Sequence, residues 1–470
     1  MRKFTHFWVR AGLILLATIG NPMGAHSRGN ETLADTPSIY EWSPAYIGTG
    51  HTQATLIFGA ILEWPIQSSS SPIPSDAIIR SKINSQLAYL IGTFQQSKLA
   101  SVLGDQTLQI LNKTRIPRTA TTPAKIQVRY QYEGTILLAQ RIQPQNGFEF
   151  YLPISIEGLY AKQRVNGKSV CTGGSDSGAA FYFYHWNPVS AGCNLVEGTD
   201  FQKIRADFQR IENTNQTYPD YARLRNDQGE IDIRVFFGKE DYGIAITDPR
   251  NHLDWGARDF ASFTKYLSDQ GYTLTPWSAE RIRKIAPSGE LPRVEEYTKT
   301  LGRTLLRVTV FFGETGFNYD STAFHRFWEN ALETAPVVIY QGHAGVGKNL
   351  HLAKIEEKLG RTIRFPIEKY QLVALAACVT YSYYPKMYFA RKKTVSDPSG
   401  SQNLDILING AESYFSNNHL YSVAVLKMME DWSAGVRAWS YQDLVVRGRA
   451  DVLYGIMGDE DNPTTPAVFP

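Results

Sequence analysis

The sequence predicts an α/β protein whose C-terminal half, residues 228–470, forms a mostly parallel sheet flanked by helices. Two observations lead to this prediction. From Glu230 onward, short apolar runs alternate with segments of helical period, as in strands joined by crossover helices. Several of these runs are apolar almost throughout, which is typical of strands covered on both faces. Residues 38–156 instead predict an N-terminal α+β domain, because strands of alternating polarity follow one long helix there.

The chain begins with a segment of the secretory type. Arg2, Lys3 and Arg10 supply positive charge around an apolar core over residues 11–19, which is too short to stop in a membrane. We therefore expect residues 1–27 to be a signal peptide, with no membrane anchor after its removal. The expected location is outside the cell, in the periplasm or in the cell envelope.

Composition and charge argue against several classes of partner. The formal net charge is only +3 over 470 residues and no basic block occurs, so neither nucleic acid nor an acidic membrane surface is expected. No histidines and cysteines stand at a metal-ligand spacing, and we expect no metal and no cofactor. The acidic run over 458–463 lacks the spacing of a calcium loop and is expected to be a solvated turn.

The three cysteines divide into a pair and one other. Cys171 and Cys193 lie close in the sequence, inside a connecting region over residues 157–227, and we expect them to form a disulfide in an exported protein. Cys378 then stands outside that pair. A thiol left over in a secreted protein is either a reactive group or a small buried hydrophobe, and both interpretations stay open at this point.

The N-terminal domain shows no catalytic constellation. Its predicted elements are strands over 54–64, 126–132, 136–142 and 148–152, with a turn at 133–135 and a helix over 79–94 after the first strand. This pattern predicts a meander packed against a helix. A pro-domain, a platform that presents substrate and an adhesion module are all compatible with it.

The C-terminal half holds more elements, which follow one another in regular alternation. They are strands over 231–237, 272–275, 305–312, 337–340, 372–377 and 403–408, and helices over 254–270, 321–332 and 414–432. The helices carry apolar residues at helical spacing, so each is expected to cover the sheet.

Two of these strands each end on a reactive side chain. The run over 337–340 leads into Gln341-Gly342-His343-Ala344-Gly345, and the run over 372–377 leads into Cys378. Loops at the carboxyl ends of neighbouring parallel strands converge, so a histidine and a cysteine that leave two such strands are expected to meet. An imidazole beside a thiol lowers the thiol pKa, supplies the attacking thiolate and later protonates the leaving amine.

This pair of motifs resembles the cysteine peptidases of the caspase, gingipain and legumain type. The continuation Ala377-Cys378-Val379 is most similar to the gingipain branch, and the resemblance covers roughly residues 230–408. It implies a caspase-like fold and a secreted endopeptidase that acts on a protein or peptide. His343 would be general base and then general acid, Cys378 the nucleophile, and backbone N–H groups around Gly342 and Cys378 would hold the oxyanion. The chain departs from the family where Ala344 stands between His343 and the next glycine.

The candidates for substrate binding follow Cys378 in the sequence. Thr380–Tyr384 is expected to be a polar, aromatic loop that lines a cleft, with Tyr381 as a contact. Asp405 and Glu412 are candidates for recognising a basic side chain, although isolated acids near strand ends are more often solvated or cap helices.

Two other functions compete with peptide hydrolysis. Gly342–Lys348 fits the phosphate-binding pattern G-x-x-x-x-G-K, but Asn349 stands where a serine or threonine should hold magnesium, and no aspartate follows the next strand. The other alternative is a catalytically silent caspase-like scaffold or binding protein of the cell envelope, because a fold does not guarantee an activity.

Overall fold

The computed structural model describes residues 51–470 with interruptions. The interruptions are residues 69, 98–99, 140–146, 166–167, 175–177, 180–183, 212–215, 241–253, 319–320, 412, 414–418 and 449–453. The expected signal peptide and Glu412 therefore lie outside the described residues. Over the ranges that are described, no helix combines the length and the apolar character that crossing a bilayer requires.

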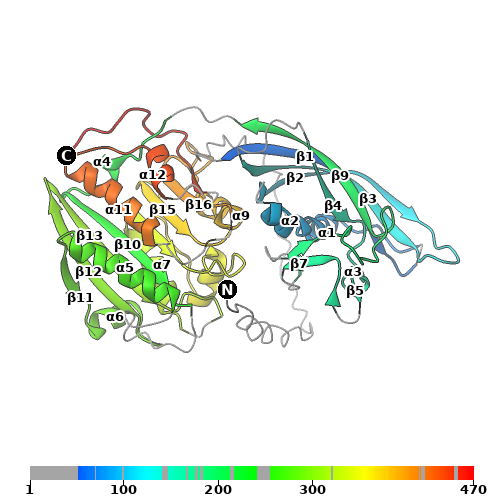
Figure 1. Cartoon of the computed structure of the whole chain (residues 1–470), viewed down its shortest axis with the longest axis horizontal. Coiled ribbons are helices and arrows are strands. Elements are labelled where there is room, and N and C mark those ends of the chain that lie inside the picture. Colours follow the sequence, from blue (N-terminus) through cyan, green and yellow to red (C-terminus); the bar gives the residue numbers. More distant parts are fainter. Residues whose placement is uncertain are drawn as a thin grey trace, which may run out of the picture. The chain divides into compact units, whose positions relative to one another are not determined.

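The first sheet of the chain is five-stranded and antiparallel, in the order β2-β3-β1-β9-β4 (Figure 1). Its strands are β1 His51–Pro65, β2 Ala100–Ile116, β3 Lys125–Ala139, β4 Phe148–Pro153 and β9 Phe201–Ile211. Two helices, α1 Asp76–Leu87 and α2 Tyr89–Ser97, pack on one of its faces through apolar residues such as Ile83 and Phe94. The single helix expected over 79–94 is thus interrupted at Ala88.

Three strands of this sheet differ from the expectation. β3 runs without a break from Lys125 to Ala139, where two strands separated by a turn were expected. β2 was not predicted, because exposed polar residues such as Gln109 and Asn112 interrupt its apolar pattern. β9 comes from the region treated as a connection, and it pairs with both β1 and β4. A strand between two others satisfies its backbone on both sides, so residues 157–227 are not separate from the N-terminal sheet.

The predicted disulfide between Cys171 and Cys193 is confirmed. Around it lie five short elements, namely α3 Leu159–Lys162, β5 Arg164–Val165, β6 Lys168–Ser169, β7 Thr172–Gly174 and β8 Tyr184–Trp186. Cys171, Tyr184 and Trp186 are buried together in a small apolar cluster. The two aromatic side chains therefore act as core residues in this part of the chain.

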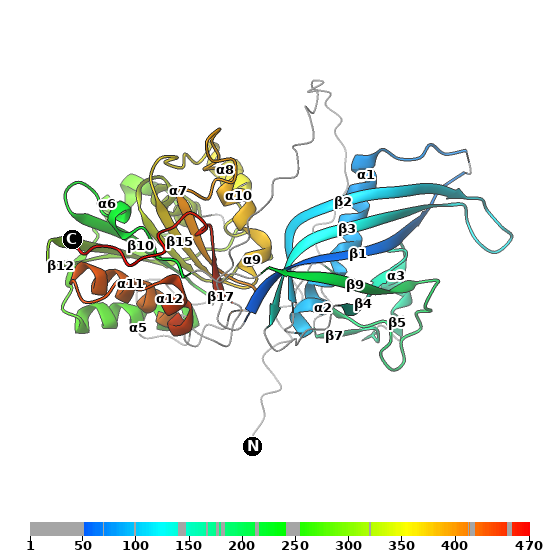
Figure 2. The same cartoon turned by 90° about the horizontal axis from the view of Figure 1, so that it is seen from above.

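The second sheet has eight strands in the order β11-β12-β13-β10-β14-β15-β16-β17 (Figure 2). Its five central strands are parallel, and the pairs at both edges are antiparallel. The strands are β10 Glu230–Gly238, β11 Thr273–Pro276, β12 Arg293–Leu301, β13 Thr304–Gly313, β14 Val337–Gln341, β15 Gln371–Ala376, β16 Leu404–Asn409 and β17 Tyr454–Met457. The predicted mixed α/β architecture is therefore confirmed.

Helices cover both faces of this sheet (Figure 2). One face carries α4 Tyr221–Leu224, α5 Trp255–Asp269, α11 His419–Ser433 and α12 Tyr441–Gly448. The other carries α6 Ala279–Ile285, α7 Ala323–Thr334, α8 Leu352–Leu359, α9 Thr380–Tyr383 and α10 Pro385–Phe389. Along the chain, the parallel strands run outward from β10 to β13 and then in the opposite direction from β14 to β16. In sheets of this kind, ligands bind outside the carboxyl ends of the strands where the order reverses, here between β10 and β14.

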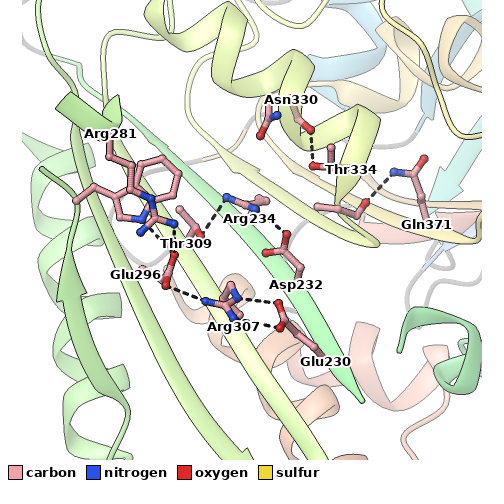
Figure 3. A network of polar contacts seen from close by, with 12 residues as sticks. Glu230, Asp232, Arg234, Arg281, Glu296, Arg307, Thr309, Asn330, Thr334 and Gln371 are labelled. Carbon is pink, nitrogen blue, oxygen red and sulfur yellow. Dashed lines mark hydrogen bonds and ion pairs between the residues drawn. The ribbon is translucent and has the colours of Figure 1, made fainter. Parts of the chain in front are cut away.

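A strip of paired charges crosses three strands of the sheet, away from that point (Figure 3). Arg307 on β13 donates to Glu230 on β10 over 2.7 and 3.1 Å, and to Glu296 on β12 over 2.9 Å. Arg281 on α6 reaches the same Glu296 over 2.7 Å, while Arg234 binds a neighbouring aspartate on its own strand. Because opposite charges alternate across the strands, the sheet tolerates a charged face where apolar side chains were expected.

Candidate active site

The two residues predicted to react lie just beyond the carboxyl ends of two neighbouring central strands of the second sheet, β14 and β15. The register pairs Gln341 at the end of β14 with Ala376 at the end of β15. The Gly342 N–H extends this ladder by donating to the Ala376 carbonyl over 3.4 Å. His343 and Cys378 each follow two residues after the paired positions, and parallel strands lie about 4.8 Å apart. The register therefore brings the histidine loop and the cysteine turn to corresponding positions.

The Cys378 thiol takes no part in the disulfide and is buried, with 7% of the residue exposed. Its Sγ accepts a hydrogen bond from the Ser413 N–H over 3.4 Å and lies 3.7 Å from the Ser413 carbonyl oxygen, to which it donates. A backbone N–H directed at the sulfur favours the thiolate over the thiol. Ser413 is therefore a contact of the thiol that the sequence did not reveal.

The His343 imidazole lies beside a carboxyl group from the segment that follows the neighbouring strand β10. Its Nε2 is 3.6 Å from Oε1 of Glu240, and 55% of its side chain is exposed. Partial desolvation lowers the pKa of His343, while the charge of Asp254 raises it. Burial, followed by the charges of Asp254 and Asp259, raises the pKa of Glu240 to about 8. At neutral pH the imidazole is therefore neutral and able to accept a proton, and Glu240 keeps its own.

Glu240 was not identified from the sequence. Glu240 lies two residues after β10. Because Phe237 of β10 pairs with Gln341 of β14, Glu240 and His343 both lie beyond the carboxyl ends of these strands. Its N–H donates to Asp254 Oδ2 over 2.8 Å, and the other oxygen of Asp254 caps α5 by accepting from the Ala257 N–H over 2.8 Å. The one sequence feature that could have identified Glu240 is its position just after a parallel strand. That position indicates a site residue only when the order of the strands in the sheet is known.

Three glycines let the backbone segments at this edge approach one another. A Cβ atom on Gly256 would lie 1.9 Å from the Gly238 carbonyl oxygen, and one on Gly238 would lie 3.3 Å from the Gly342 Cα. The first turn of α5 therefore rests directly on the end of β10, and the end of β10 lies against Gly342, the residue after β14.

Replacing Gly256 with alanine is expected to lower the free energy of unfolding by about 3 kcal/mol, because backbone atoms must move to admit the new methyl group. Gly59→Ala is the matched control, since its Cβ would lie 3.8 Å from the nearest atom. Urea unfolding of both variants measures the difference. Equal midpoints would show that the segments are not in close contact.

Backbone strain occurs directly after Cys378 and three residues after His343. Among the described residues, Val346 and Val379 are the non-glycine positions with positive φ, each at 53°. A left-handed conformation is unfavourable for a β-branched residue and persists where the surroundings impose it, which is typical of functional sites. Val379 directly follows Cys378 and donates its N–H to the Ala411 carbonyl over 2.8 Å. The chain therefore turns sharply just after the thiol.

Side-chain hydrogen bonds fix the loop that carries His343. Its carbonyl oxygen accepts from the Tyr340 hydroxyl and from Asn349 Nδ2, both over 2.8 Å. Asn349 thus holds the loop at the position where a phosphate-binding loop needs a hydroxyl. Lys348 is exposed, and α8 begins only at Leu352, so the glycines do not lead directly into a helix. This geometry gives no support to the nucleotide-binding alternative.

Several residues predicted to bind substrate or the oxyanion make hydrogen bonds with other parts of the protein instead. Tyr381 is fully buried, and its hydroxyl accepts a hydrogen bond from Gln53 over 2.7 Å, so it does not line a cleft. Asp405 pairs in the register with Leu372, near the opposite end of the strands, and is fully buried. Its Oδ2 accepts from the hydroxyls of Tyr370 and Tyr441 rather than facing a substrate. The Gly342 N–H is used by the Ala376 carbonyl, so it can serve an oxyanion only after that bond opens.

The acidic turn near the C-terminus is also different from the expectation. Asp459 is fully buried and accepts a hydrogen bond from the Thr217 hydroxyl over 2.5 Å. Asn462 is buried as well and donates to Asp405 over 2.6 Å. The turn is therefore held in the interior by hydrogen bonds to residues distant in the sequence, Thr217 and Asp405.

Within the described ranges, no three histidine, cysteine or acidic side chains come together as a metal-binding group. Comparisons with protein-family models, with curated proteins and with solved structures found no match to this chain. The residues around His343 and Cys378 are therefore the basis for inferring the function of this site.

Proposed function

We propose that this protein is a secreted cysteine peptidase of the caspase-like type, with Cys378 as the nucleophile and His343 as the proton carrier. One observation carries the proposal: both residues follow neighbouring parallel strands, β14 and β15, at corresponding positions, and β14 borders the point where the strand order reverses. The strained Val379, directly after Cys378, and the strained Val346, in the loop of His343, support the same conclusion.

The chemistry follows from the two side chains. His343 Nε2 takes the proton of the Cys378 thiol, and the thiolate attacks the peptide carbonyl carbon to give a tetrahedral oxyanion. When that intermediate collapses, the protonated imidazole gives its proton to the leaving amine, and a thioester remains on Cys378. A water molecule, deprotonated by the same imidazole, then hydrolyses the thioester and restores the thiol.

Export is supported by the disulfide between Cys171 and Cys193. Disulfides persist in oxidising compartments and are rare in the cytosol. Together with the segment over 1–27, this favours a protein that works outside the cell on a protein or peptide substrate.

The competing candidate is a catalytically silent scaffold. Two observations favour it: only 7% of Cys378 is exposed, and Ala344 replaces the glycine that follows the histidine in the resembling family. A buried thiol without an activating imidazole is an inert hydrophobic residue.

Alkylation of Cys378 by iodoacetamide decides between the two candidates. In the intact protein it is the sole thiol, because the other two cysteines are bonded to each other. A peptidase should react with an apparent thiol pKa clearly below the ordinary value of about 8.5, and His343→Ala should move that pKa upward. A wild-type profile at the ordinary value, or no labelling in the folded protein, would leave the scaffold as the function.

A further inference from the structure

The loop that carries His343 has an unfavourable backbone conformation. Gly345, Val346 and Gly347 follow one another with φ of 57°, 53° and 77°, all in the left-handed region. Glycine adopts this conformation readily, but a valine is strained there and keeps it only where surrounding groups impose it. Groups outside the run 345–347 must therefore hold the loop in this shape.

A relay of two buried hydroxyls ends on this loop. The Tyr340 hydroxyl donates to the His343 carbonyl over 2.8 Å, and the Thr315 hydroxyl lies 3.0 Å from the Tyr340 oxygen. A hydroxyl has one proton and a carbonyl can only accept, so Tyr340 uses its proton on His343 and Thr315 donates to Tyr340. Both hydroxyl residues are buried, and water does not compete for these bonds.

Two glycines leave the space that the relay occupies. A Cβ atom on Gly238 would lie 2.5 Å from Thr315 Oγ1, and one on Gly342 would lie 2.7 Å from the Tyr340 hydroxyl oxygen. The glycines at the end of β10 and just after β14 therefore admit these hydroxyls as well as the close backbone contact described above.

The side chain of Asn349 holds the same carbonyl from a second direction. Its Nδ2 donates to the His343 carbonyl over 2.8 Å, and its Oδ1 accepts from the Phe317 N–H over 3.0 Å. A Cβ atom on Gly345 would overlap that Oδ1, so the amide lies directly against the loop. An amide donates and accepts at the same time. This double role accounts for an asparagine at the position where a phosphate-binding loop has a hydroxyl.

Both sets of bonds begin in one short segment after β13, because Thr315 and Phe317 are two residues apart, and both end on the His343 carbonyl oxygen. We propose that Thr315 and Asn349 are positioning residues, which act through this carbonyl to hold the His343 imidazole in its reactive position. The inference rests on the proposed function, in which that imidazole moves the proton of Cys378. A displacement of about 1 Å in such a group can slow a reaction by about 10²-fold.

Thr315→Val and Asn349→Asp test this proposal. Thr315→Val keeps the shape of the side chain and leaves both donors on the His343 carbonyl, whereas Asn349→Asp turns one of these donors into an acceptor. On one peptide that the wild-type protein cleaves, kcat is expected to fall roughly threefold in the first variant and roughly 30-fold in the second. KM should stay unchanged, because the bonds act on the proton transfer and not on substrate binding.

The pH dependence of Asn349→Asp supplies a readout that a purely structural role would not change. A protonated carboxyl group donates a hydrogen bond as the amide does, whereas an ionised one repels the His343 carbonyl. The ratio of the kcat of this variant to that of the wild type is therefore expected to rise as the pH is lowered. The corresponding ratio for Thr315→Val should stay constant.

Tyr388→Phe is the matched control, because it removes a buried hydroxyl that bonds the Leu350 carbonyl and the Trp328 indole without touching the His343 carbonyl. It should lower the urea midpoint and keep the wild-type kcat. If Thr315→Val and Asn349→Asp behave in the same way, their role is structural and the inference is overturned.

The His343→Ala variant separates failure of this inference from failure of the proposed function. Loss of turnover in His343→Ala, with wild-type kcat in both positioning variants, overturns the inference and leaves the peptidase proposal in place. If the wild type cleaves no peptide and His343→Ala leaves the alkylation profile of Cys378 unchanged, the proposed function fails, and the inference fails with it.

Discussion

Replacing His343 with alanine is expected to reduce the turnover of a peptide substrate by about 10³-fold while leaving the fold intact. The imidazole is the group that removes the thiol proton and later protonates the amine, and no other histidine follows a strand at this edge among the described residues. The side chain is largely exposed, so its truncation opens no cavity. Cleavage of a mixed peptide library, followed by mass spectrometry, measures the effect.

Two further variants complete this experiment. Cys378→Ala removes the nucleophile and is expected to abolish cleavage altogether. His351→Ala is the control, since His351 lies at the start of α8, outside the strand ends, and should retain wild-type turnover. Equal cleavage by Cys378→Ala and the wild type would assign the activity to a contaminant, and silence of every variant including the wild type would end the peptidase proposal.

Replacing Asp459 with asparagine is expected to stabilise the protein at neutral and alkaline pH. Burial raises the pKa of Asp459 from its ordinary value of 3.8 to about 8 in the folded protein. The folded chain therefore holds a proton between about pH 4 and pH 8 that the unfolded chain releases. The contribution of protonated Asp459 to the free energy of unfolding is therefore greatest below about pH 4. It decreases as the pH rises to about 8 and stays constant at higher pH. Asparagine resembles the protonated acid and removes the decline.

The expected gain reaches about 6 kcal/mol at pH 9, as the upper limit set by the difference between the two pKa values. Asp405 contributes to the same effect, because burial and the charge of Asp459 raise its pKa well above the usual range. Neither Asp405 Oδ1 nor Asp459 Oδ1 has a partner among the described residues. Urea unfolding at pH 5, 7 and 9 gives the pH dependence for wild type and variant.

Asp269→Asn is the control for this measurement, since Asp269 is exposed and pairs with Lys265 on the surface of α5. Exposed pairs contribute little, so its pH profile should match that of the wild type within about 1 kcal/mol. Loss of stability in Asp459→Asn at every pH would mean that the carboxylate is ionised and stabilising in the folded protein.

The apolar strands were predictable because their pattern is local. The runs over 337–340 and 372–377 correspond to β14 and β15 within a residue or two, and the expected strand over 231–237 corresponds to β10. A short run of side chains that is apolar throughout has few alternatives to a strand covered on both faces. The residues at the ends of these strands could therefore be identified from the order of amino acids alone.

Polar strands and buried polar groups were not predictable in the same way. β12 was missed because Glu295 and Glu296 interrupt its apolar pattern, yet both are buried against Arg293, Arg281 and Arg307. The loop after Cys378 was expected to be an open cleft, and its tyrosines are instead buried in the core. In each case the partner that makes burial tolerable comes from a distant part of the chain.

The sequence by itself determined the alternation of strands and helices in the second half, the disulfide, and the presence of one histidine and one cysteine at the ends of two apolar strands. Only the tertiary structure decided that these strands are neighbours in register, that Glu240 lies beside His343, and that Asp405 and Asp459 are buried. The physical reason is range: periodicity records which face of an element is apolar, whereas the neighbour of a polar group depends on strand order and on packing between segments far apart in the chain.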